Sequence, residues 1–180
     1  MKYRIEKNEV REINGHKCYR IYATNNFTTN DGREIKTGDK GGWVENENNL
    51  SQEGSCWVAD EAAAFGLAKV DGNAILCDFA KVEGRACVEG EAKITNNARV
   101  SDNANVYGNA HISDNANVYG NARIYGNALV YGRAKISGRA QAYDFAQVYD
   151  DANLLGDVRA CEYADVHGNA RIFLRTEIKQ

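Results

Sequence analysis

Aliphatic residues recur at every sixth position over most of the chain. In steps of six from Val58 to Ile172, all twenty positions hold Val, Ile, Leu or Ala. Alanine stands four residues after each of the first nineteen, with Val158 as the one exception. Each unit therefore reads Ala-x-Val-x and then two turn residues, often Gly-Asn or Asp-Asn. The alternation predicts a short β-strand in every unit, and the turn residues favour a corner between units because they tolerate a positive φ.

These corners come too often for a sheet of hairpins. A two-residue corner every six residues bends the chain, but it leaves no strand long enough to pair with its neighbour in an antiparallel sheet. Three units that close one turn would instead place residues eighteen apart above one another in parallel ladders. The sequence therefore predicts an all-β fold, a parallel β-helix of about six and a half coils over residues 57–172, with alanine and aliphatic side chains filling a narrow core.

The first 56 residues lack this period. Asn14-Gly15 and Asp31-Gly32 each lie between β-prone runs, which is a strong signal for a β-hairpin. We expect a small antiparallel meander over residues 1–40, within an N-terminal cap that spans residues 1–56.

Both ends of the predicted β-helix need closing, because an open end exposes backbone and core. At the N-terminal end, Trp43 and Trp57 are expected to act as a plug. At the C-terminal end, Phe173 and Leu174 depart from the repeat. We expect residues 173–180 to form a closing segment that contains a strand.

Two features of the chain resemble a known superfamily. Units such as VYGNAR and ISDNAN resemble hexapeptide repeats, in which a small residue follows an aliphatic one by four positions. Residues 38–60, with their GGWV and LSQEGSCWV elements, resemble the YdcK-like branch of that superfamily, which includes bacterial and phage-associated proteins. The resemblance implies a left-handed β-helix and assembly as a trimer or dimer. It also implies acyl transfer from a CoA-type donor in a cleft between subunits, with a histidine as general base and often a loop thrown out of the helix beside it.

Composition narrows the function classes. The net charge of −3, from 22 basic and 25 acidic side chains, is too balanced for a general nucleic-acid binder, so nucleic acid is not an expected partner. The five cysteines include no Cys-x-x-Cys pair and the three histidines are widely spaced, so we expect no disulfide framework, no metal and no cofactor. The sequence also lacks the apolar run of a signal peptide and the roughly 18 apolar residues of a membrane span. We therefore expect a cytoplasmic protein that has no contact with a membrane.

The histidines give little support for catalysis. His111 and His167 fall on outward positions of one face, three coils or about 15 Å apart, which is too far for them to act as a pair. His16, beside the Asn14-Gly15 turn, is expected to be a hairpin residue. Since twenty repeats run without an inserted loop, we expect no catalytic residue. His111 at a subunit seam is the alternative if the chain is an acyltransferase.

The outward positions of the repeat form ladders on three sides of the predicted rod. One side carries an aromatic strip of three tyrosines, Tyr107, Tyr125 and Tyr143. The next side carries a broken basic row flanked by a tyrosine: Lys81, Arg99, Lys135 and Arg171, with Tyr119. The third side carries residues that would form an exposed apolar patch: Trp57, Ile75, Leu129, Tyr131 and Tyr149. Stacked tyrosines stabilise a parallel sheet by themselves, whereas exposed apolar patches usually mark contact surfaces.

Two functional hypotheses follow from these features. The first is a non-catalytic scaffold that presents the six tyrosines to a protein partner and the four basic residues to an anionic ligand. The resemblance to phage-associated proteins makes a host component a candidate partner. The second is a hexapeptide-repeat acyltransferase that uses a CoA-type donor. Either hypothesis includes self-assembly, for which the apolar patch is the expected surface.

Overall fold

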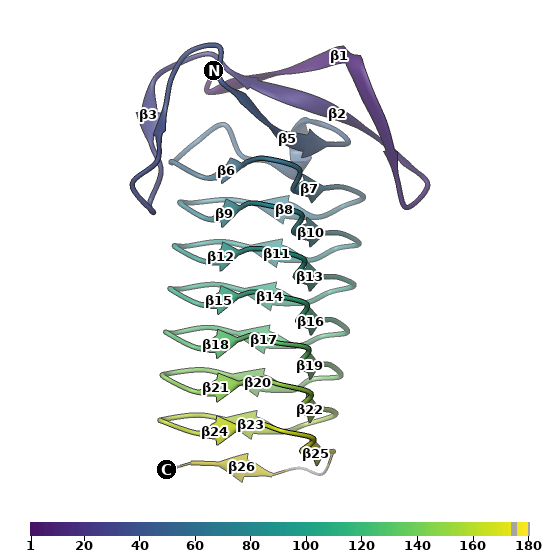
Figure 1. Ribbon diagram of the computed structural model, residues 1–180, viewed down its shortest axis with the longest axis vertical. Helices are drawn as coiled ribbons and strands as arrows, with labels where there is room; N and C mark the ends of the chain where they lie inside the picture. Colours follow the sequence, from purple (N-terminus) through teal and green to yellow (C-terminus); the bar gives the residue numbers. More distant parts are fainter. Residues whose placement is uncertain (174–175, 180) are drawn as a thin grey trace.

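The computed structural model describes residues 1–173 and 176–179, and it confirms an all-β fold built on a parallel solenoid (Figure 1). Antiparallel strands lie across the upper end, and the repeat continues below them in about seven turns. Each turn contributes one strand to each of three faces, which gives the rod three flat sides. The hand of the solenoid stays a prediction from the family resemblance.

The strands group into three sheets, which we call faces 1, 2 and 3. Face 1 contains the cap strands β1 (Tyr3–Ile13), β2 (His16–Ala23) and β5 (Lys40–Val44), followed by β7 (Ala63–Ala64), β10 (Lys81–Val82), β13 (Arg99–Val100), β16 (Asn117–Val118), β19 (Lys135–Ile136), β22 (Asn153–Leu154) and β25 (Arg171–Ile172). Face 2 contains β8 (Lys69–Val70), β11 (Cys87–Val88), β14 (Asn105–Val106), β17 (Arg123–Ile124), β20 (Gln141–Ala142), β23 (Arg159–Ala160) and β26 (Glu177–Ile178). Face 3 contains β6 (Trp57–Val58), β9 (Ile75–Leu76), β12 (Lys93–Ile94), β15 (His111–Ile112), β18 (Leu129–Val130), β21 (Gln147–Val148) and β24 (Asp165–Val166).

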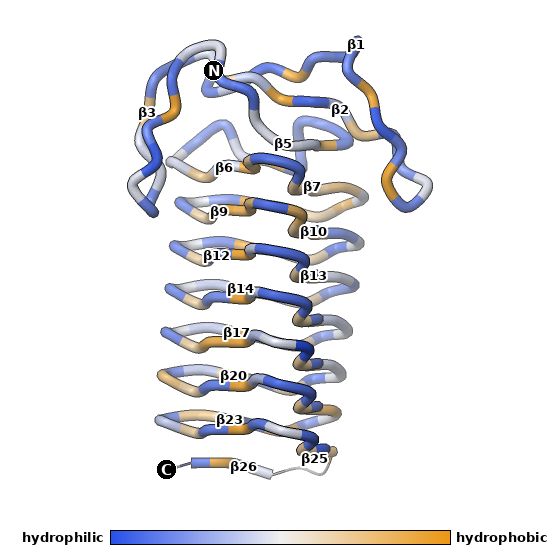
Figure 2. Tube along the Cα trace, in the orientation of Figure 1, coloured by the Kyte–Doolittle hydropathy of each residue, from blue (hydrophilic) through white to orange (hydrophobic). Residues whose placement is uncertain are grey.

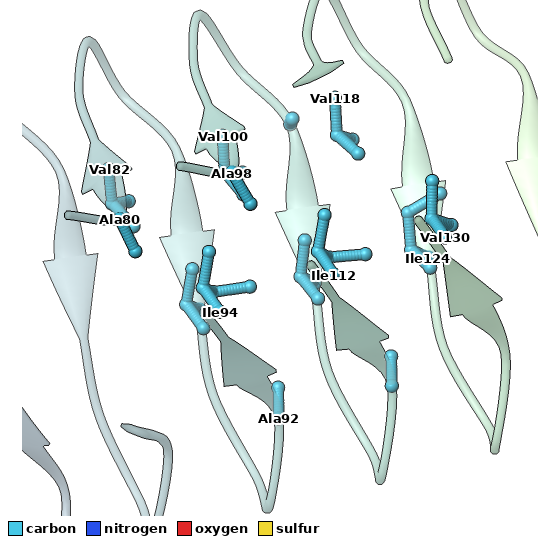
Figure 3. Close-up of a cluster of buried hydrophobic side chains, with 14 of the residues drawn as sticks. Ala80, Val82, Ala92, Ile94, Ala98, Val100, Ile112, Val118, Ile124 and Val130 are labelled. Carbon is cyan, nitrogen blue, oxygen red and sulfur yellow. The ribbon is translucent and has the colours of Figure 1, made fainter. Parts of the chain in front are cut away.

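The register between coils is eighteen residues throughout, as the period predicts. Val82 of β10 pairs with Val100 of β13, for example, and Lys81 pairs with Arg99. The first residue of each short strand points outward and the second inward, so the aliphatic repeat residues enter the core. From Val58 to Leu154 these residues are at most 1% exposed. Figure 3 shows the resulting columns of Ala, Val and Ile, and Figure 2 shows apolar and polar residues alternating along every coil.

The corners depend on residues in the left-handed conformation. Asp102, at φ 59°, is one of them, and its carboxylate accepts a hydrogen bond from the Gly120 amide of the next coil at 2.9 Å. Asp114 makes the equivalent contact with the Gly132 amide at 3.0 Å. The positive φ thus falls on the first residue of each Asp-Asn or Gly-Asn pair. An aspartate there can offset its backbone strain through one hydrogen bond to the coil below.

The cap contains the expected antiparallel strands, although they do not form one continuous meander. β1 pairs with β2 and β2 with β5, while β3 (Phe27–Thr28) and β4 (Glu34–Ile35) form a separate two-stranded hairpin. β5 then pairs in parallel with β7, which joins the cap directly to the first coil. In Figure 1 the β1–β2 hairpin descends beside face 1 and the β3–β4 hairpin beside face 3.

The two tryptophans are both buried where the cap meets the first coil, and they belong to different hydrophobic clusters. Trp43 of β5 pairs with Ala63, the outward residue of β7, and lies under the β1–β2 hairpin in a cluster with Ile13 and Cys18. Trp57, the first residue of β6, lies against Phe27 of β3, with ring centroids 5.4 Å apart. Tyr3, Ile21 and Leu50, each fully buried, belong with Trp57 to the core cluster at this end. The 3₁₀ helix η1 (Glu47–Asn49) helps to close this end, because the buried Asn49 amide donates to the carbonyls of the first coil.

The closing segment continues the ladder. β26 pairs in parallel with β23, and Ile178 stands opposite Ala160 at the same eighteen-residue spacing. The repeat is therefore resumed after Phe173, which is 62% exposed. The expected departure at Leu174 lies outside the described residues.

Candidate binding surfaces

The tyrosine strip on face 2 forms as the repeat predicts. Tyr107 and Tyr125 stack with ring centroids 4.9 Å apart and planes 1° from parallel, and Tyr125 and Tyr143 stack at 4.8 Å and 3°. These distances equal the strand spacing of a β-sheet, so the parallel register alone is enough to stack the rings. The Tyr125 hydroxyl donates to Gln141 Oε1 at 3.3 Å. Burial raises the pKa of Tyr125, so its phenol stays protonated near neutral pH.

The stacking determines which atoms of the tyrosine strip are accessible to a partner. Each ring covers a face of its neighbour, so the ring edges and the hydroxyl groups are what remain accessible. All three tyrosines are half-buried. At the lower end Tyr143 lies beside the buried Cys161, and a hydrogen bond with that thiol, followed by burial, raises the Tyr143 pKa.

The apolar patch expected on face 3 is smaller in the structure. Trp57 and Ile75 are each only 1% exposed, so the prediction that they form part of an exposed surface is wrong. The β3–β4 hairpin lies over this part of the face, and its tip reaches the Glu91 carbonyl, to which Asn30 donates at 3.3 Å. The hairpin precedes the repeat in the sequence, so the period of the repeat could not predict that the hairpin covers this part of the face.

The lower part of the patch remains on the surface. Leu129 is 36% exposed. Tyr131 stacks on Tyr149 at 4.8 Å, and Tyr149 stacks on His167 at 5.2 Å. A continuous aromatic stack therefore covers three coils of face 3 beside Leu129.

The basic row on face 1 is not one site. Lys81 and Arg99 lie opposite each other on β10 and β13. Lys135 and Arg171 are separated from each other by Asn153 on β22. The structure therefore brings the first two together and leaves the other two apart. Tyr119, on the same face, is half-buried and no ring contact is recorded for it in the part of the chain that is described.

His111 and His16 occupy different settings, and neither belongs to the aromatic stack that holds His167. His111 is half-buried, with Nε2 3.1 Å from the Thr95 hydroxyl. Burial, and then the nearby Lys93 ammonium, lower the His111 pKa, so its imidazole is neutral at pH 7. His16 is more than a turn residue, because its Nδ1 lies 2.9 Å from Glu45 Oε2 and its ring lies 5.1 Å from that of Phe65.

A polar cluster beneath the β1–β2 hairpin has no counterpart in the sequence predictions. The Glu61 carboxylate forms ion pairs with Arg11 and Arg20, and it accepts the Trp43 indole N–H at 3.1 Å. Both guanidinium groups lie over the Trp43 ring, at 4.4 Å for Arg11 and 3.9 Å for Arg20. No short motif could have revealed this cluster, since 41 residues separate Arg20 from Glu61.

One group of potential metal ligands occurs among the described residues. Oxygen and sulfur atoms of Asp60, Cys77 and Asp78 lie within 4.8 Å of one another. Arg33 already pairs with Asp60 at 3.3 Å, and burial raises the pKa of the Cys77 thiol to about 11. The Arg33 guanidinium therefore competes with any cation for the Asp60 carboxylate. In the same described residues, no helix has the length and apolar character needed to cross a membrane.

Comparisons with known proteins agree with the repeat architecture. A family model of the YdcK β-solenoid repeat matches residues 122–138. A protein of Escherichia coli strain K12, named uncharacterized acetyltransferase YdcK, is 46% identical over 44 residues. This alignment covers 24% of the present chain and only 14% of that relative. The repeat match, the partial relative and the observed solenoid together fit a YdcK-like branch of the hexapeptide-repeat proteins.

Proposed function

We propose that this chain is a non-catalytic scaffold that binds a protein partner through the tyrosine strip, Tyr107, Tyr125 and Tyr143. The observation that carries the proposal is the stacking of the three rings at 4.8–4.9 Å on one flat face. Tyrosine is common in protein interfaces because it combines a rigid apolar body with a polar hydroxyl. A strip of fixed rings loses little conformational freedom when a partner binds, which favours affinity.

The geometry also limits the kind of partner. Because the ring faces are covered by one another, the strip does not provide open platforms on which the bases of a nucleic acid could stack. Its exposed edges and hydroxyls repeat with the spacing of β-strands, about 4.8 Å. A β-structured protein could therefore make the same contact at each coil.

The test is to replace Tyr125, the central ring, with Ser. The tagged protein and its Tyr125→Ser variant are used to capture partners, and the amount of each captured protein is compared. The strand position points outward, so the fold should be unchanged, and loss of a central aromatic contact should lower capture at least about tenfold. Tyr119→Ser is the matched control, because it removes a tyrosine from face 1. Equal capture by wild type and Tyr125→Ser, or an equal loss with Tyr119→Ser, would contradict the proposal.

Self-association is a separate part of the proposal. The exposed Leu129 and the Tyr131–Tyr149 stack form an apolar surface on face 3 below the β3–β4 hairpin. We propose that this surface joins copies of the chain into a dimer or trimer. A contact on face 3 leaves the tyrosine strip on face 2 free for another partner.

An acyltransferase is the second candidate, and the name of the Escherichia coli relative favours it. His111 is the residue that could serve as the general base, because its imidazole is neutral and lies on an outward strand position. Calorimetry with acetyl-CoA tests this candidate directly. Binding of acetyl-CoA and an acetylation activity lost in His111→Ala would support it, whereas no binding at millimolar acetyl-CoA would exclude it.

A further inference from the structure

The β1–β2 hairpin and face 1 enclose a hollow of about 470 Å³ on the side of the rod. Arg11, Ile13 and Asn14 of the hairpin form its wall, and Lys81 and Arg99 form its floor. In Figure 1 the hairpin tip lies beside the upper strands of face 1. The volume falls within the range of small-molecule binding sites, which is about 300–1,000 Å³.

The floor of the hollow holds an unusual pair of charges. Lys81 and Arg99 occupy directly paired positions on neighbouring strands, where like charges destabilise a sheet. Across the described coils, no other two Lys or Arg residues are paired eighteen apart. Two arginines lower on the rod instead have an aspartate one coil below them, Arg133–Asp151 and Arg139–Asp157, each with the ionic atoms 2.6 Å apart. Nothing in the repeat requires the Lys81–Arg99 pair.

Two acidic residues near the floor are held by other groups. Glu61 is bound by Arg11 and Arg20, and Glu83 Oε2 accepts a hydrogen bond from Asn14 Nδ2 at 3.1 Å. Glu12 lies on the wall, opposite Lys17 across the hairpin. In the described part of the chain, neither Lys81 nor Arg99 forms an ion pair. The two cations of the floor therefore have no carboxylate within ion-pair distance.

An aromatic side chain completes the hollow. Phe79 lies at its edge and is 59% exposed. Phe79 lies at a corner of the coil that contains Lys81. The equivalent corner positions in the next two coils are Asn97 and Asn115. An exposed phenylalanine beside two unpaired cations suits a ligand that has both an apolar group and an anionic group.

We propose that this hollow binds a phosphate monoester that carries an aromatic or apolar group. Lys81 and Arg99 contact the phosphate, since a dianion between two cations removes their mutual repulsion and a guanidinium can bind two phosphate oxygens at once. Phe79 packs against the apolar group, and the hairpin wall restricts access from one side. The site lies on face 1 and does not depend on the tyrosine strip of face 2.

Titration of the full chain with phenyl phosphate, followed by calorimetry at low salt, tests the proposal. Lys81→Ala and Arg99→Ala should each weaken phenyl phosphate about tenfold, which corresponds to about 1.4 kcal/mol. Phe79→Ala should weaken phenyl phosphate several-fold and leave the weaker binding of inorganic phosphate unchanged. Lys135→Ala, which removes an exposed cation from the same face, is the matched control and should have no effect.

A second measurement separates binding from a folding defect. Phenyl phosphate should raise the thermal midpoint of the wild type and not that of Lys81→Ala, while circular dichroism shows that both are folded. The proposal is wrong if the wild type does not bind phenyl phosphate at millimolar concentration, or if Lys135→Ala weakens binding as much as Lys81→Ala does. Unchanged phenyl phosphate affinity in Phe79→Ala would likewise overturn the assignment of an aromatic ligand.

Discussion

Replacing Glu61 with Gln should loosen the cap from the first coil. The Glu61 carboxylate is the shared partner of Arg11, Arg20 and the Trp43 indole. Arg20 is only 5% exposed, and its remaining hydrogen bonds go to the carbonyls of Gly41 and Asp60. A glutamine keeps the shape and one acceptor, but it leaves the buried guanidinium without a counter-charge, which is costly.

The size of the effect follows from the Glu61 pKa. Hydrogen bonds from Arg20, Trp43 and Arg11 outweigh the desolvation of the carboxyl group and lower its pKa from 4.5 to about 2. A shift of this size corresponds to about 3 kcal/mol between the charged and neutral forms. The Glu61 side chain is 34% exposed, so solvent screening reduces the expected contribution to about 1–2 kcal/mol.

The pH dependence has a definite sign. Since the folded protein lowers the Glu61 pKa, the stabilisation is complete above about pH 4.5 and is lost as the pH falls towards 2. The difference in unfolding free energy between wild type and Glu61→Gln should therefore be largest near neutral pH. It should shrink below pH 4.5 and disappear near pH 2.

Urea denaturation followed by tryptophan fluorescence measures this difference. The chain has two tryptophans, and both lie where the cap meets the first coil, so fluorescence reports on the cap and circular dichroism on the whole solenoid. Glu91→Gln, at an exposed glutamate, is the control for removing one negative charge. The reasoning fails if Glu61→Gln and wild type differ by less than about 0.5 kcal/mol at pH 7, or if their difference does not change between pH 5 and 2.

Three further predictions concern the repeat itself. Asp102→Ala should destabilise the solenoid by about 2 kcal/mol, because the variant loses the hydrogen bond to Gly120 and keeps a side chain at positive φ. Asp102→Gly should cost less than about 1 kcal/mol. Equal losses of unfolding free energy in urea denaturation would contradict the role given to φ. Ile112→Ala should cost about 2–5 kcal/mol by the same assay, since Ile112 is fully buried and a rigid prism cannot collapse around the cavity, so a loss below 1 kcal/mol would count against a close-packed core. Leu129→Glu should leave the circular dichroism spectrum unchanged and reduce the molar mass measured by light scattering to that of a monomer; an unchanged assembly would rule out face 3 as the self-association surface.

The sequence determined the solenoid almost completely. The aliphatic residue recurred at every sixth position from Val58 to Ile172, an alanine followed it by four residues everywhere except at Val158, and a turn-prone pair such as Gly-Asn or Asp-Asn often marked the corner. A parallel coil of eighteen residues places each residue above its own equivalent, so a local pattern also fixes the contacts between coils. The stacking of Tyr107, Tyr125 and Tyr143 could be predicted for the same reason.

Only the tertiary structure decided which surfaces of the rod the cap covers. The burial of Trp57 under the β3–β4 hairpin, the Glu61 cluster and the hollow over Lys81 and Arg99 all join segments that lie tens of residues apart. Hairpin signals such as Asn14-Gly15 predict that a hairpin forms, but they contain no information about which surface it meets. Each residue of the repeat contacts its equivalent at a fixed spacing of eighteen residues in the sequence. The contacts of the cap depend on how it packs against the rod, which no local sequence pattern specifies.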